Sequence, residues 1–107
     1  MKGFVEREKG FEAEFKRNQE LAFRVTARRN RLFGLWAADR LGLTAGEAAE
    51  SYAKSVVAAD FEKPGDADVI AKVQSDLAEK GVAITDSELR AELDRAAGEA
   101  RRQLMQS

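Results

Sequence analysis

Cysteine and histidine are both absent from this sequence of 107 residues. Without cysteine there is no disulfide, thiolate metal site or cysteine nucleophile, and without histidine the commonest general base and the usual zinc ligand are missing. No apolar run approaches the roughly 18–20 residues that a membrane-spanning helix needs. The charged N-terminus also lacks the apolar core of a secretory signal. We therefore expect a soluble cytoplasmic protein that does not insert into the membrane.

Helix breakers and aromatic residues are also scarce, with one proline, eight glycines and 7% aromatic residues. Ala, Glu, Lys, Arg and Leu dominate, and these residues favour helices. No stretch alternates apolar and polar residues for long enough to predict a strand. A chain of this length forms one domain that buries roughly two-thirds of the surface of its unfolded form. The composition therefore predicts a single all-α domain.

Apolar residues recur at helical spacing in four segments, which we expect to form amphipathic helices. These segments run from about 18 or 19 to 41, from 44 to about 61, from 66 to 81 and from 85 to about 104. In the first, the predicted stripe consists of Leu21, Val25, Leu32, Leu35 and Trp36. The other stripes are Ala45, Ala49, Tyr52, Ala53 and Val56, then Val69, Ile70, Val73 and Leu77, then Leu89, Leu93, Ala96, Ala97, Ala100 and Leu104. The short joins predict a small antiparallel four-helix bundle over residues 19–105.

Residues at the predicted helix ends support these boundaries. Gly42 and Gly81 are suited to close the first and third helices. Thr85, followed by Glu88, has the pattern of a capping box at the start of the fourth helix. Pro64 separates the second helix from the third, because proline cannot continue a helical hydrogen-bond ladder.

Residues 1–18 differ from the rest of the chain. Three phenylalanines, Phe4, Phe11 and Phe15, share one side of a helical wheel, but Gly3 and Gly10 each cost a helix about 1 kcal/mol. So few apolar anchors do not hold a helix in isolation. One interpretation is a segment that is loose in the free protein and folds as an anchor helix in the groove of a partner. The other is an extension of the first helix whose phenylalanines cover the bundle.

Charge is unevenly distributed along the chain. Residues 21–40 carry five Arg and one Asp, a net charge of +4, whereas residues 41–100 carry thirteen acidic and six basic residues, a net charge of −7. The sequence pI of about 5.6 argues against a nucleic-acid partner. The basic cluster includes Arg24, Arg28 and Arg31, which we regard as candidates to contact an anion or nucleotide. The alternative for Arg28 is a semi-buried ion pair with Asp60 or Asp39.

None of the many carboxylate pairs is isolated in an apolar pattern that would favour acid–base catalysis. The segment 62–66 (EKPGD) contains a lysine and a glycine, but it lacks the spacing of a phosphate-binding loop. We therefore expect a protein that is not an enzyme and needs no cofactor.

Four blocks of the sequence resemble a known family. Residues 28–38 (RRNRLFGLWAA) are similar to the signature of the zeta subunits of the alphaproteobacterial F-type ATP synthase, a family of small ATPase inhibitors. Residues 7–12 (REKGFE), 52–57 (YAKSVV) and 60–69 (DFEKPGDADV) are similar to further blocks of that family in the same order. The resemblance covers nearly the whole chain.

The resemblance implies a four-helix bundle, at 19–105, that carries an N-terminal inhibitory segment at 1–18. In that family the segment enters a catalytic interface of the synthase head and blocks rotation in the direction of ATP hydrolysis. Carried onto this chain, the partner-binding residues would be Phe4, Arg7, Phe11, Phe15, Lys16 and Arg17. The protein would be a monomer when free and would reach the inner face of the membrane through the synthase.

Two alternatives to this function remain open at the level of the sequence. Some members of the family have been linked to adenine-nucleotide binding, so the chain could be a bundle that senses ATP or ADP. It could also be an interaction module for another protein, without inhibitory activity.

Overall fold

The computed structural model describes residues 2–44, 46–62 and 65–106, with side chains described from Lys16 onward except for Phe61 and Glu62. These residues form four helices, α1 (Lys2–Arg40), α2 (Gly46–Glu62), α3 (Asp66–Glu79) and α4 (Asp86–Met105), and no strand lies within the described ranges. The all-α fold with four helices predicted from the sequence is confirmed.

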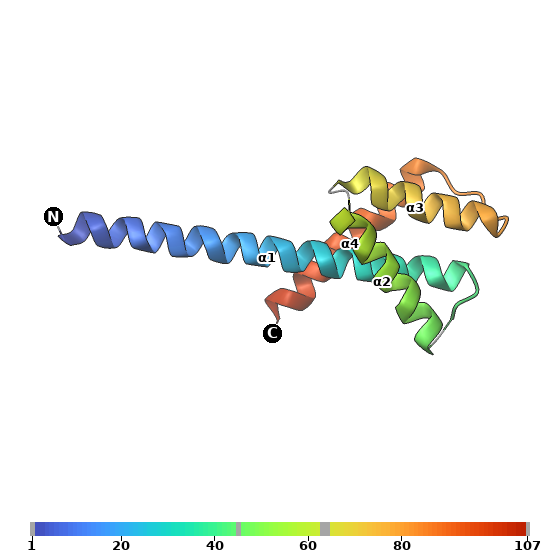
Figure 1. The fold of residues 1–107 in the computed structure, drawn as a ribbon, viewed down its shortest axis with the longest axis horizontal. Helices are drawn as coiled ribbons and strands as arrows, with labels where there is room; N and C mark the ends of the chain where they lie inside the picture. Colours follow the sequence, from blue (N-terminus) through green and yellow to red (C-terminus); the bar gives the residue numbers. More distant parts are fainter. Residues whose placement is uncertain (1, 45, 63–64, 107) are drawn as a thin grey trace.

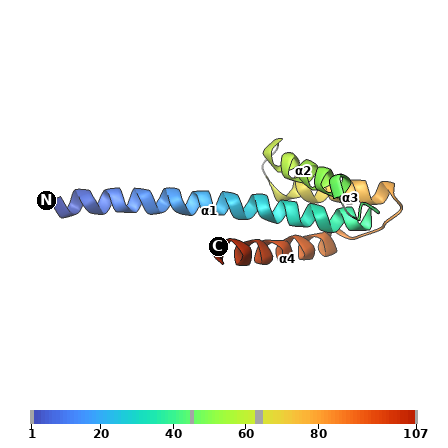
Figure 2. The ribbon, with the colours of Figure 1, turned by 90° about the horizontal axis from the view of Figure 1, so that it is seen from below.

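Helix α1 is the central element of the fold. It contacts α2, α3 and α4. Helices α2 and α4 lie on opposite sides of it (Figure 2). Helix α4 runs back along α1, so that the C-terminus lies beside the middle of α1 (Figure 1). The N-terminal half of α1 extends beyond the other helices, which gives the molecule principal extents of 66 × 25 × 22 Å.

The start of α1 differs from the sequence prediction. The helix is continuous from Lys2, whereas the residue pattern predicted a start near Asn18. Residues 2–17 contain no proline, and their Glu, Lys, Arg and Ala residues favour a helix, so Gly3 and Gly10 do not interrupt it. We call residues 2–17 the arm, because this part of α1 projects from the rest of the molecule.

The ends of α1 and α3 and the start of α4 follow the predicted signals, whereas α2, for which the sequence predicted a capping box of Thr44 and Glu47, begins at Gly46. Gly42, with φ of 85°, and Gly81, with φ of 78°, each occupy the left-handed conformation that glycine adopts without strain. After Gly42 the amide of Leu43 donates to the carbonyl of Ala38 at 2.8 Å, the long hydrogen bond of a Schellman motif. Thr85 caps α4 by accepting from the amide of Glu88 at 3.1 Å.

The core joins all four helices. In α3 the predicted stripe is buried in full, and in α4 Leu89, Leu93 and Ala100 are buried as predicted. Among the described side chains of α2, Ala49, Ala53 and Val56 are buried, and they also belong to its predicted stripe.

In α1 the prediction placed the centre of the stripe on the wrong side. Among its described side chains the most buried residues are Asn30, Phe33, Gly34, Ala37 and Ala38, whereas the predicted Leu21, Val25, Leu32, Leu35 and Trp36 are only partly buried. The reason is the packing of α2, which crosses α1 over small residues that contribute little to a hydrophobic pattern. A Cβ atom added at Gly34 would lie 2.8 Å from the Cα atom of Ala53, so the two backbones approach closely at this point.

Candidate partner-binding surfaces

The arm carries most of the predicted partner-binding residues. Phe4, Arg7, Phe11 and Phe15 lie in α1, but their side chains are outside the described residues. Lys16 and Arg17 are exposed. Figures 1 and 2 both show that no other helix runs beside the N-terminal end of α1, so the backbone there is open to a partner.

The three arginines proposed as anion contacts follow the arm on the same helix, and all are exposed. Arg28 donates from Nη1 to Oε1 of Gln103 at 3.2 Å. Arg31 forms an ion pair with Glu50 at 2.7 Å. Arg24 has no hydrogen bond or ion pair with any residue that the structure describes.

The semi-buried ion pair expected for Arg28 is formed by its neighbour instead. Arg29, whose side chain is 13% exposed, lies 2.9 Å from a carboxylate oxygen of Asp66 in the first turn of α3. Its Nε and Nη2 atoms also donate to Oδ1 of Asn30, at 3.0 and 2.9 Å. The prediction of an Arg28 pair with Asp60 or Asp39 is therefore wrong, because Arg28 faces the end of α4 and Arg29 faces α3.

Asn30 is the residue that the sequence analysis missed. It is only 1% exposed and is the one buried polar side chain among the described residues. Buried polar groups in folded proteins are almost always hydrogen-bonded. The two hydrogen bonds from Arg29 satisfy the side-chain carbonyl oxygen of Asn30. The available signal was its position among three arginines inside a helix, since asparagine has low helix propensity and needs a structural reason there.

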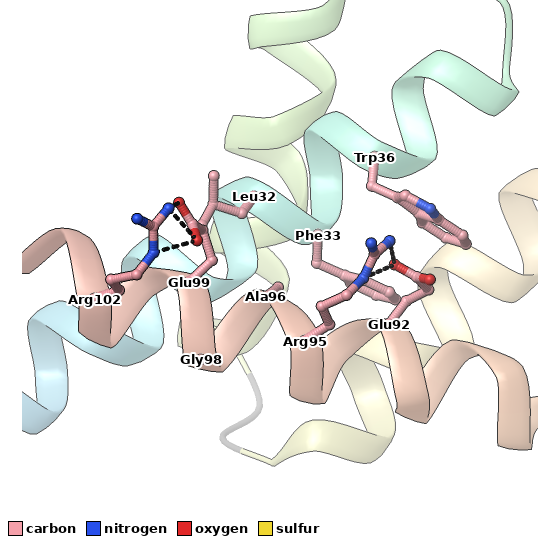
Figure 3. A pocket seen from close by; sticks show the side chains of 9 residues that line it. All are labelled: Leu32, Phe33, Trp36, Glu92, Arg95, Ala96, Gly98, Glu99 and Arg102. Atoms are coloured by element: carbon pink, nitrogen blue, oxygen red, sulfur yellow. Dashed lines mark hydrogen bonds and ion pairs between the residues drawn. The ribbon is translucent and has the colours of Figure 1, made fainter.

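A groove of about 660 Å³ runs between α1 and α4 (Figure 3). At its floor the rings of Phe33 and Trp36 stack with their centroids 5.7 Å apart, and the guanidinium of Arg40 lies 4.1 Å from the Trp36 ring centroid. The Nε1 atom of Trp36 is buried and has no described hydrogen-bond partner.

The charged rim of this groove is internally neutralised. Arg95 pairs with Glu92 and Arg102 pairs with Glu99, both at 2.5 Å (Figure 3). The hydrogen bond from Arg102, followed by one from Gln103, lowers the pKa of Glu99. Because the two arginines and the two glutamates line the same groove, its described lining has no excess positive charge with which to attract an anion.

A second polar cluster ties α2 to α3. The hydroxyl of Tyr52 donates to Asp76 at 2.8 Å, and Lys72 approaches the same carboxylate at 3.1 Å. The Lys72 ammonium also lies 5.4 Å from the Tyr52 ring centroid. Burial, the hydrogen bond to Asp76 and the charge of Asp76 together raise the pKa of Tyr52 well above its usual range.

The part of the chain that the structure describes contains neither a candidate metal site nor a candidate membrane span. No group of three or more acidic side chains there could hold a metal ion. No helix within the described ranges combines the length and apolar character needed to cross a membrane.

The fold and these surfaces define a small all-α protein in which a helical arm projects from a packed four-helix body. The chain belongs to the family of the ATPase inhibitor subunit zeta, which matches residues 1–103, and this confirms the resemblance found in the sequence. A protein known from a solution NMR structure is similar in both sequence and fold. It is 44% identical with a TM-score of 0.67, and the match covers 78% of this chain and 94% of that chain. No curated protein matches the sequence.

Proposed function

We propose that this protein inhibits ATP hydrolysis by the F-type ATP synthase, and that its arm acts as the inhibitory element by entering a catalytic interface of the synthase head. Family membership supports the inhibitory role. The observation that carries the assignment to the arm is the projection of α1 beyond the packed body (Figure 1). A projecting helix can enter a groove between subunits while the body stays outside.

The proposed mechanism is a steric block. Phe4, Phe11 and Phe15 would supply the apolar anchors, because buried aromatic side chains dominate the binding energy of many interfaces. Arg7, Lys16 and Arg17 would pair with acidic groups that line the entrance. A helix held between two subunits prevents the closure that catalysis requires, so no bond-making residue is needed and the protein acts as a regulator rather than an enzyme.

The partner and the location of the protein follow from the same proposal. The free protein is a monomer in the cytoplasm, and the bound protein lies at the inner face of the membrane through the synthase head. It does not need nucleic acid, membrane insertion or a cofactor. Adenine-nucleotide binding is a separate hypothesis, which no described contact favours and which titration of the purified protein with ATP tests.

The proposal is tested by ATP hydrolysis of the cognate synthase head with the full chain and with a chain lacking residues 1–17. We expect the shortened chain to stay folded, because the first buried residue among the described side chains is Asn30, and to lose inhibition. Full inhibition by a folded shortened chain would assign the activity to the body and overturn the proposal.

A milder test keeps every charge of the arm. The double variant Phe11→Ala and Phe15→Ala should weaken inhibition, since each lost anchor removes roughly 1–3 kcal/mol of binding free energy. The matched control is Met105→Ala, which truncates an apolar side chain that is 73% exposed at the other end of the chain. The control should inhibit like the unchanged protein.

A further inference from the structure

A second groove, of about 500 Å³, lies on α1 directly beyond the arm. Its apolar lining comes from three helices, with Ala27 on α1, Val57 on α2 and Leu104 on α4. Phe23 also lines it, and this side chain is 57% exposed, which is high for so large an apolar group. The groove therefore offers apolar surface that a bound side chain could cover.

The charged lining of this groove has a single sign. Arg24, Arg28 and Arg31 all line it, and none of its described lining residues is acidic. The contacts of Arg28 with Gln103 and of Arg31 with Glu50 are exposed, and exposed contacts of this kind contribute little stability and exchange readily. Arg24 is without a described partner. The net charge of the whole chain is −1, so this positive charge is a feature of the groove and not of the whole molecule.

The groove is continuous with the arm. A neighbouring hollow of about 330 Å³ is lined by Lys16, Gln19, Glu20, Phe23 and Arg24. Phe23 and Arg24 line both hollows, so one continuous track runs along α1 from the end of the arm to Arg31, and Glu20 is the one acidic residue in its described lining.

From this arrangement we infer that the groove is a second docking site, which receives an acidic amphipathic helix of the protein that holds the arm. Three arginines at positions i, i+4 and i+7 of one helix match carboxylates spaced at the same helical pitch. The apolar floor takes one apolar side chain from between them, in the way that amphipathic helices enter grooves. The partner's identity rests on the proposed function, but the chemistry of the occupant rests on the groove alone.

The groove chemistry can be tested without the synthase. The probe is a synthetic helical peptide with glutamates at i, i+4 and i+7 and a leucine at i+3, titrated into the ¹⁵N-labelled full chain. Amide shifts should concentrate on the groove residues, Phe23, Arg24, Ala27, Arg28, Arg31, Val57 and Leu104. The matched peptide with glutamine in place of each glutamate should produce little change.

Three results would overturn this assignment. The first is binding of both peptides alike, since charge would then play no part. The second is the same shifts on concentrating the protein alone, because the occupant would then be a second copy of the chain. The third is a response to anionic phospholipid vesicles but not to the acidic peptide, which would make the track a membrane contact.

The Arg24→Glu variant tests the same groove in an assay of ATP hydrolysis by the synthase head. Arg24 has no described partner, so this change leaves the described contacts of the fold intact. We expect it to raise the concentration needed for half-inhibition by about tenfold, as loss of an interface arginine does, and to reduce the salt dependence of binding. Complete inhibition should remain at saturation, because the arm is unchanged. The matched control is Lys80→Glu, an exposed position at the end of α3.

The two proposals fail separately. An Arg24→Glu protein with unchanged half-inhibition, beside a shortened chain that has lost inhibition, rejects the second docking site and keeps the arm as inhibitor. A shortened chain that inhibits fully rejects the arm, while the peptide titration still decides whether the groove binds an acidic helix.

Discussion

At the scale of single residues, Gly34 and Gly98 are both inside helices but differ in their surroundings. A Cβ atom at Gly34 would meet Ala53 Cα at 2.8 Å and Val56 Cβ at 3.3 Å, whereas at Gly98 nothing lies within 4 Å. Gly34 is therefore required for the close approach of α2. Gly98 only weakens α4, because glycine costs a helix about 1 kcal/mol relative to alanine.

We predict opposite effects for alanine at these two positions. Gly34→Ala should lower the free energy of unfolding by about 1–3 kcal/mol, the usual cost of overpacking a tight contact. Gly98→Ala should raise it by about 0.5–1 kcal/mol. Urea denaturation of the two variants measures both changes, and a Gly34→Ala protein at least as stable as the unchanged chain would contradict the described α1–α2 contact.

Tyr52 makes the stability depend on pH in the alkaline range. The raised pKa means that the folded protein holds the phenol neutral, whereas the unfolded chain ionises it near pH 10. The stabilisation is therefore complete below about pH 10 and is lost as the pH rises from there toward the pKa of the folded state.

Tyr52→Phe should remove this dependence at a cost of about 1 kcal/mol at neutral pH, because the hydrogen bond to Asp76 is lost. The stability difference between the two proteins should shrink above pH 10. Tyr52 is the one tyrosine of the chain, so its ionisation is followed directly by ultraviolet absorbance. Ionisation near pH 10 in a protein that keeps its circular dichroism would contradict the burial of the phenol.

At the scale of elements, the two parts of α1 differ in their packing against other helices. From Asn30 to Ala38 it carries buried residues that contact the other helices. The arm has no neighbouring helix in either view (Figures 1 and 2). Helices without tertiary packing are marginal in water, and two glycines weaken this one further.

We therefore predict that the amides of residues 2–17 exchange with solvent at nearly free rates in the isolated protein, whereas those around Asn30 to Ala38 are protected. Hydrogen exchange followed by NMR measures the difference along the helix. Equal protection along the whole of α1 would show that the arm is stable on its own, and would favour a preformed inhibitory helix over one that folds on binding.

At the scale of the whole molecule, the projecting arm determines the elongated shape (Figure 1). The radius of gyration is 17.4 Å, compared with about 13 Å for a compact chain of this length. Every buried side chain that the structure describes lies at or beyond Asn30.

Deletion of residues 1–17 should therefore reduce the radius of gyration by a few ångströms, toward the compact value, and leave the melting temperature nearly unchanged. Small-angle X-ray scattering and thermal circular dichroism give the two quantities. A large fall in the melting temperature would mean that the arm packs on the body in solution, as the alternative interpretation of its phenylalanines supposed.

The sequence by itself determined the helices, most of their ends and the family. Helical spacing and capping chemistry act within a few residues, so Thr85, Gly42 and Gly81 were identifiable without neighbours. The stripe of α3 was also predictable, because α3 buries one side and that side consists of large apolar residues.

Only the tertiary structure decided which side of α1 is buried and which arginines remain exposed to a partner. Because α1 is packed on more than one side, its burial follows the close crossing at Gly34 rather than the positions of its largest side chains. The roles of Arg28 and Arg29 depend on whether the start of α3 or the end of α4 lies opposite. Local spacing carries no information on that placement, since it arises from how separate helices pack together.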